Sequence, residues 1–213
     1  MLLFLLCLMP CVLIFYCCAV KNRKVYPVMF IGIMTAVIYC LVRVMGFYSH
    51  RLIPDSLSSN YIYYLIRYTL IPVISIYVLY ILLTRDSWEF KLNMFFPLLG
   101  TFYAIFIPYK VIAFTQSIYS GYDIFLRPVL YTAMIGQCAI CLSNLYKSIT
   151  NKKIINIILN ILVMIVYLLI PAMMDAMFDL NMELWIIVTV TVLYGLITLT
   201  WAVLKLVLAK IKK

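Results

Sequence analysis

The feature that most constrains this chain is a series of long apolar runs separated by short polar connections. Seven runs can be marked, each close to the roughly 20 residues that an α-helix needs to cross the hydrocarbon core of a bilayer. The runs are 2–20, 26–48, 61–84, 92–115, 124–148, 154–175 and 184–208. Because backbone groups in lipid must be hydrogen-bonded within the protein, we predict that each run is a transmembrane helix.

The composition supports the same fold class. Hydrophobic residues make up 67% of the 213 residues and charged residues only 11%, whereas soluble domains are about half apolar and about a quarter charged. Continuous apolar runs also differ from the alternating pattern of a transmembrane β-barrel. The connections are too short for a separate soluble domain. We therefore expect an all-α, polytopic integral membrane protein, in which residues 1–213 form a single seven-helix transmembrane domain.

The distribution of basic residues predicts the orientation of the helices. Twelve of the 17 Lys and Arg residues fall in alternate connections and in the C-terminal tail, and only Asp86 and Glu89 accompany them. The twelve are Lys21, Arg23, Lys24, Arg85, Lys91, Lys147, Lys152, Lys153, Lys205, Lys210, Lys212 and Lys213. The positive-inside rule places this face in the cytoplasm, with the N-terminus outside and the C-terminus inside.

The charge pattern also indicates which partners and which location to expect for this protein. The basic charge is explained by topology and by attraction to anionic lipid, so no nucleic-acid partner is expected. Basic residues follow the first run, with no charged residue before it and no evident cleavage site, so we expect that run to be retained. Apolar runs that contain cysteines without a disulfide framework, together with a retained first run, fit a bacterial inner (plasma) membrane, and a eukaryotic membrane stays open.

Four basic residues lie inside predicted helices rather than in connections. They are Arg43, Arg67, Lys110 and Arg127. A rise of 1.5 Å per residue places all four at a similar depth, in about the outer quarter of the membrane. Charged side chains at such positions are costly and often mark a functional site.

These four residues lead us to expect an outward-facing basic vestibule that binds an anionic or zwitterionic ligand. A guanidinium group can bond two oxygens of a carboxylate or phosphate at once. Tyr64 and Tyr131, one turn from Arg67 and Arg127, are predicted to add hydroxyl groups to the same site. Pro72 and Pro108 are candidate gating positions, because proline removes a backbone donor and can kink a helix.

Two alternatives for the four bases stay open. Long basic side chains near a helix end can extend to the lipid headgroups without binding any ligand. They can also form ion pairs with nearby acids. The candidates are Asp123, which lies four residues before Arg127, and Asp175, Asp179 and Glu183 near the outer ends of the last two runs. Sequence spacing does not decide whether the four bases converge on one cavity.

Signals for catalysis, metal binding or a cofactor are weak. The seven cysteines lie in apolar runs, and an odd number is not a disulfide framework. Cys138 and Cys141 have the spacing of a redox motif, but in the middle of a run they are interpreted as packing residues. The single histidine, His50, lies in a predicted loop with no nucleophile motif beside it. We predict no catalytic residue, no metal ligand and no cofactor, and an enzyme is disfavoured.

Three functions are compatible with this pattern. The first is a small membrane transport or solute-binding protein, and it is favoured if the four bases converge. The alternative is a non-catalytic membrane subunit or sensor that acts through a membrane protein partner or a second copy of the chain, and it is favoured if they point to lipid. The third is an intramembrane enzyme on a lipid-linked phosphate, with His50 or Asp55 as the proton carrier.

Overall fold

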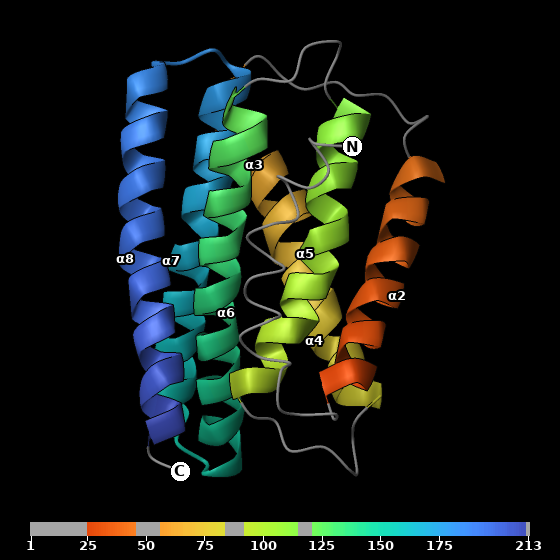
Figure 1. The fold of residues 1–213 in the computed structure, drawn as a ribbon, viewed down its shortest axis with the longest axis vertical. Helices are drawn as coiled ribbons and strands as arrows, with labels where there is room; N and C mark the ends of the chain where they lie inside the picture. The colour runs from red at the N-terminus through yellow and green to blue at the C-terminus, as the bar shows by residue number, and fades with distance from the viewer. Residues whose placement is uncertain (1–24, 46–55, 84–91, 115–120, 212–213) are drawn as a thin grey trace.

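A computed structural model describes residues 25–45, 56–83, 92–114 and 121–211, and within them every regular element is a helix (Figure 1). The elements are α2 (Val25–Met45), α3 (Leu57–Tyr64), η2 (Leu65–Leu70), α4 (Ile71–Leu83), α5 (Leu92–Phe114), η3 (Tyr122–Leu126), α6 (Arg127–Thr150), α7 (Ile154–Asp179) and α8 (Leu184–Ile211). The segments η2 and η3 are π-helical and continue directly into α4 and α6. The all-helical prediction is confirmed for the described residues.

Four helical stretches are long and apolar enough to cross a membrane, which indicates a membrane protein. They are Val25–Met45, Leu57–Tyr80, Tyr122–Thr150 and Ile154–Asp179. The described residues of each predicted run from 26–48 onward lie on a helix or on a continuous helical series. The run 2–20 lies outside the described residues. The number of seven spans and the orientation of the termini stay predictions.

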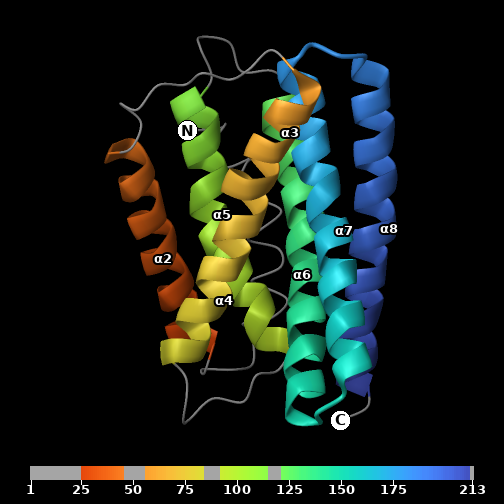
Figure 2. The same ribbon diagram turned by 180° about the vertical axis from the view of Figure 1, so that it is seen from behind.

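The helices form an elongated bundle with α6 at its centre. In Figure 1 the long helices run side by side in the order α8, α7, α6, α5 and α2, and Figure 2 shows α3 and α4 crossing one face of the bundle. The helix α6 packs against α5, α7 and α8, while α2 packs against α5, and α3 packs against α7. Most of α6 is buried, so the core lies between α5 and α6.

Large apolar side chains are exposed on the outer helices. Phe30 of α2 is 62% exposed, Ile155 of α7 is 81% exposed and Leu196 of α8 is 62% exposed. Soluble proteins rarely expose continuous apolar surface on this scale. These faces suit contact with lipid, in agreement with the length and composition of the helices.

The helices α2 and α5 approach closely at Gly32. A Cβ atom at this position would lie 2.0 Å from Oγ1 of Thr101 and 2.6 Å from the carbonyl oxygen of Leu98. The second contact is with backbone, which cannot rotate away as a side chain can. Glycine at this position therefore allows the two helices to pack at their observed separation.

Tyrosine hydroxyl groups bridge helices at positions where a proline cannot donate. In α7, Pro171 lacks the N–H group that would bond the carbonyl oxygen of Tyr167 one turn earlier. The hydroxyl group of Tyr194, on α8, donates to that oxygen at 3.0 Å. A side chain of a neighbouring helix thus satisfies the carbonyl, as is common where proline interrupts a membrane helix.

Two tyrosine hydroxyl groups compensate in the same way for the missing donor of Pro72. Its missing N–H group would bond the carbonyl of Tyr68 in an α-helical register or that of Arg67 in a π-helical register. Tyr103 of α5 donates to the carbonyl oxygen of Tyr68 at 3.2 Å, and Tyr39 of α2 donates to that of Arg67 at 2.6 Å. The irregular segment η2 is therefore tied to both neighbouring helices.

The close approach at Gly32 predicts the effect of one added methyl group. We expect Gly32→Ala to lower the free energy of unfolding by about 1–3 kcal/mol, the usual cost of overpacking. Gly121→Ala is the matched control, because a Cβ atom there would have nothing within 4 Å. Thermal unfolding of the purified protein in detergent measures both. Equal stability of the two variants would contradict the packing argument.

The bridge at Pro171 predicts a dependence between two substitutions. Tyr194→Phe removes one hydrogen bond and is expected to cost about 1 kcal/mol of unfolding free energy. In a Pro171→Ala background the cost is expected to fall close to zero, because the new N–H group of residue 171 donates to the carbonyl of Tyr167. A double-mutant cycle by thermal unfolding measures this difference. The same cost in both backgrounds would show that the bridge does not replace the missing donor.

Candidate functional site

The polar residues gather around Asp175, a fully buried carboxylate near the C-terminal end of α7. Its Oδ1 atom accepts hydrogen bonds from the hydroxyl group of Tyr122 at 2.9 Å and from Nε of Arg127 at 3.0 Å. Its Oδ2 atom accepts from the hydroxyl group of Tyr131 at 2.7 Å and forms an ion pair with Nζ of Lys110. Residues of α5, η3, α6 and α7 therefore meet at one side chain.

A second carboxylate completes the charge balance. Nη1 of Arg127 forms an ion pair with Oδ1 of Asp123, one turn earlier in η3. The side chains of Lys110 and Arg127 are only 3% and 5% exposed. Two cations and two anions make this part of the network formally neutral. An uncompensated charge in such surroundings would cost several kcal/mol, so the pairing explains how an apolar bundle holds these residues.

Three tyrosine rings surround the ammonium group of Lys110. Its Nζ atom lies 4.2 Å from the ring centroid of Tyr68, 4.6 Å from that of Tyr64 and 5.4 Å from that of Tyr131. It also donates to the hydroxyl oxygen of Tyr131 at 3.3 Å. All three rings are within the distance at which a cation is attracted to an aromatic face.

The buried residues around Asp175 form one cluster, which consists of Asp123, Asp175, Lys110, Arg127, Tyr64, Tyr68, Tyr122 and Tyr131. The other two predicted bases lie at the edge of this cluster. Nη2 of Arg43 donates to the hydroxyl oxygen of Tyr68 at 3.2 Å, so the half-buried Arg43 reaches the cluster through that ring. Arg67 is exposed, and its Nη1 atom donates to the hydroxyl oxygen of Tyr63 on the same helical rod at 3.3 Å. The structure thus brings Lys110 and Arg127 together, places Arg43 one ring away and leaves Arg67 on the surface.

The predicted tyrosines lie within the cluster. Tyr131 contacts both Asp175 and Lys110. The hydroxyl group of Tyr64 donates to Oδ2 of Asp179 while its ring faces Lys110. These contacts connect the cluster to the last residue of α7.

Both π-helical segments carry residues of the cluster. The segment η2 contains Arg67 and Tyr68, and η3 contains Tyr122 and Asp123. Each is followed two residues later by a proline, Pro72 or Pro128, which cannot supply the donor of a regular α-helical turn. Short π-helical segments within α-helices are frequent at functional sites.

The gating role predicted for Pro72 and Pro108 stays a prediction. Pro72 lies in the first turn of α4, directly after η2, and Pro108 lies inside α5, two residues before Lys110. Both are therefore close in sequence to residues of the cluster. His50 and Asp55, the proton carriers of the enzymatic hypothesis, lie outside the described residues.

Sequence reasoning considered Asp175 only as one of several possible partners and did not consider Tyr122. The predicted run ended at residue 175, but α7 continues to Asp179, so Asp175 lies inside the helix instead of at its end. Tyr122 precedes the predicted run 124–148 and belongs to η3. An acidic residue within an apolar helix, at the depth of the bases, was the signal that could have identified the centre.

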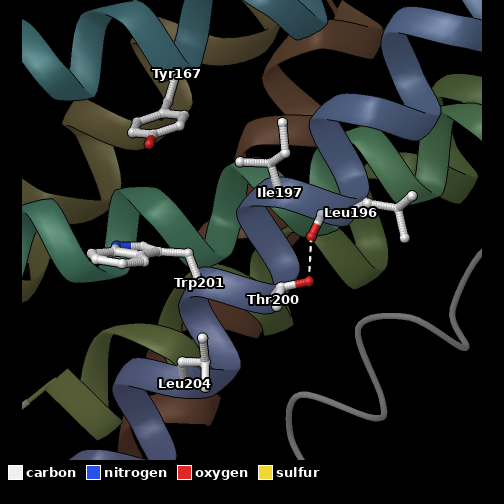
Figure 3. A pocket seen from close by; sticks show the side chains of 6 residues that line it. All are labelled: Tyr167, Leu196, Ile197, Thr200, Trp201 and Leu204. Atoms are coloured by element: carbon white, nitrogen blue, oxygen red, sulfur yellow. Dashed lines mark hydrogen bonds between the residues drawn. The ribbon is translucent and has the colours of Figure 1, made fainter.

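A separate groove lies on the lipid-facing surface of α7 and α8 (Figure 3). It is shallow and mostly apolar, has a volume of about 420 Å³, and is lined by Tyr167, Leu196, Ile197, Thr200, Trp201 and Leu204. None of these six residues is charged. Within the described part of the chain, no group of three or more His, Cys, Asp or Glu side chains is placed to hold a metal ion.

Comparisons of the chain with protein-family models, with characterised proteins and with solved structures find no match. The function of this chain is therefore inferred from the geometry and chemistry of the cluster around Asp175. The relevant facts are its burial, its paired charges and its position among helices that can cross a membrane.

The burial of Asp175 predicts that its charge is essential to the fold. We expect Asp175→Asn to cost about 3–5 kcal/mol, because Lys110 and Arg127 lose their shared carboxylate. Adding Lys110→Met to Asp175→Asn is expected to restore part of this loss, since it removes one of the two buried cations. Thermal unfolding measures both, with the exposed Glu183→Gln as control. An Asp175→Asn variant as stable as the control would contradict this assignment.

Proposed function

We propose that this chain is a small membrane transport or solute-binding protein whose ligand, anionic or zwitterionic, binds at the cluster around Asp175. The observation that supports this most directly is that two buried cations, Lys110 and Arg127, share one carboxylate. An arrangement that already holds carboxylate groups offers the donors that a ligand carboxylate or phosphate needs. Ionisable residues inside membrane helices are by default candidates for a ligand or ion pathway.

In this proposal the ligand anion replaces Asp123 on the guanidinium group of Arg127. Asp123 lies in η3, close to the end of the bundle, whereas Asp175 is fully buried within α7. The side chain of Asp123 is 5% exposed and that of Asp175 is 0% exposed, so Asp123 is the acid that a ligand would replace with less rearrangement. The exchange of one carboxylate for another leaves the charge of the network unchanged, which avoids exposing Arg127 as an unpaired buried cation.

The proposal includes a topology. The cluster lies at one end of the bundle, and Lys147, Lys152 and Lys153 lie near the other end, where α6 and α7 are joined. By the positive-inside rule the lysine end faces the cytoplasm and the cluster faces outward. Seven spans, an N-terminus outside and a bacterial inner membrane complete this topology. The prolines and π-helical segments beside the cluster are where the helices would bend to admit the ligand.

An alternative is a membrane subunit or sensor that acts through a protein partner. The observation that favours it is the groove on α7 and α8, where Trp201 and Tyr167 border a surface that another helix could fill (Figure 3). Lipid chains fit the same surface. In this alternative the charged cluster contributes only to stability. Ligand binding at Arg127 would therefore favour the transport or solute-binding function over the subunit or sensor.

The proposed exchange predicts that removing Asp123 strengthens anion binding. Ligands that bind the folded state raise its thermal stability by mass action. At constant ionic strength, we expect one class among acetate, phosphate and chloride to stabilise the wild type. For Asp123→Asn, we expect the same stabilisation at about tenfold lower concentration of that anion, which corresponds to about 1.4 kcal/mol of binding free energy.

The control variants are Arg127→Lys and Glu183→Gln. Arg127→Lys keeps the charge but loses the planar fork of the guanidinium group, and it is expected to lose most of the response. Glu183→Gln removes an acid outside the cluster and is expected to behave as the wild type. If no anion class stabilises the wild type or Asp123→Asn, or if Arg127→Lys responds fully, the proposed function is wrong.

A further inference from the structure

We propose that Asp175 and the rings of Tyr64, Tyr68 and Tyr131 form a binding site for a primary ammonium group, which Lys110 fills as an internal ligand. A solute bearing its own ammonium group takes this place when it binds. The inference rests on the proposed function and narrows its ligand class to zwitterions that carry a primary ammonium group beside an anionic group. We call the four residues the ammonium site.

The chemistry of the ammonium site is that of a cation receptor. A carboxylate oxygen and three tyrosine rings surround the position of Nζ of Lys110, and the hydroxyl oxygen of Tyr131 accepts a hydrogen bond from it. Aromatic faces that enclose a cation are a recurrent means of binding ammonium ligands. A buried lysine that only balanced the charge of Asp175 would need the carboxylate but not the three rings.

The ammonium site is built without the helix that carries Lys110. Tyr64 belongs to α3, Tyr68 to η2, Tyr131 to α6 and Asp175 to α7, whereas Lys110 belongs to α5. Withdrawal of the lysine side chain therefore leaves the four groups in place on other elements.

Each group of the ammonium site also has a partner other than Lys110. The carboxylate of Asp175 retains its bonds from Arg127 and two tyrosines. Tyr64 donates to Asp179, and Tyr68 accepts from Arg43. The site is thus held in its shape by contacts that do not involve the lysine, which lowers the cost of binding another cation.

Charge explains why the solute should be a zwitterion. A free cation that took the place of the ammonium group of Lys110 would leave the displaced lysine, which stays attached to α5, as an additional positive charge. A zwitterion brings an anionic group that balances this charge. Its ammonium group replaces that of Lys110 beside Oδ2 of Asp175, and its anionic group lies next to Arg127, which bonds the other oxygen of the same carboxylate.

Chemical rescue of Lys110→Ala tests the ammonium site. The substitution removes Cγ, Cδ, Cε and Nζ, and propylammonium supplies the same four heavy atoms. We expect propylammonium chloride to raise the unfolding temperature of Lys110→Ala by several degrees more than an equal concentration of sodium chloride. Tetramethylammonium, which has no N–H donor, is expected to stabilise the variant less.

Three further variants define the specificity of the rescue. Lys110→Arg keeps the site filled and is expected to show no response, and Lys147→Ala, an exposed lysine on α6, is the matched control. Asp175→Asn combined with Lys110→Ala is expected to abolish the rescue. A folded Lys110→Ala that does not respond, or a response equal in all variants, overturns the proposal. If Lys110→Ala folds only when purified with propylammonium, the proposal is supported, and failure to fold with and without it overturns the proposal.

The ligand class is tested on the wild type with alanine and propionate, which differ by the ammonium group. We expect alanine to stabilise the protein more than propionate, and an equal effect would overturn the assignment to zwitterions. The two proposals fail separately. Anion binding that depends on Arg127 without rescue by propylammonium leaves the proposed function intact and removes the ammonium site. Rescue by propylammonium without any anion binding leaves the ammonium site intact and removes the proposed function.

Discussion

The polar end of this bundle depends on one buried carboxylate. Asp175 accepts hydrogen bonds from two tyrosines and two bases that come from three other helical elements. In an apolar interior, neither Lys110 nor Arg127 is tolerated without an opposite charge. The positions of α5 and α6 relative to α7 are therefore restricted to those in which both bases reach the same side chain. This electrostatic requirement acts on a bundle whose other contacts are largely non-directional apolar packing.

The backbone is irregular where the charges gather and regular where the bundle is purely apolar. The π-helical segments η2 and η3 lie beside the cluster, each just before a proline. Carbonyl groups that Pro72 leaves without a donor accept tyrosine hydroxyl groups instead. Tyrosine therefore has two functions in this protein: its ring faces the cations, and its hydroxyl group satisfies the backbone of a neighbouring helix. The rings of Tyr64, Tyr68 and Tyr131 have the first function, and the hydroxyl groups of Tyr39, Tyr103 and Tyr194 have the second.

Helix positions were predictable from the sequence because a bilayer sets the length of an apolar run. The runs 92–115 and 154–175 correspond to the helices Leu92–Phe114 and Ile154–Asp179, with small differences at the ends. Helix ends are less predictable, because the last turn depends on local contacts such as that between Tyr64 and Asp179. The π-helical segments were not foreseen, because a proline inside an apolar run predicts a kink but not the hydrogen-bond register of the turn before it.

The sequence by itself determined that the described part of this chain is helical and that several of its helices are long and apolar enough to cross a membrane, and it predicts that Arg43, Arg67, Lys110 and Arg127 lie at similar depths. These properties follow from the length of apolar runs and from the constant rise of a helix. Only the tertiary structure decided which of these bases meet. Convergence depends on the rotation of each helix about its axis and on its neighbours. Those are set by contacts between residues far apart in the chain, such as Lys110 with Asp175 and Gly32 with Thr101.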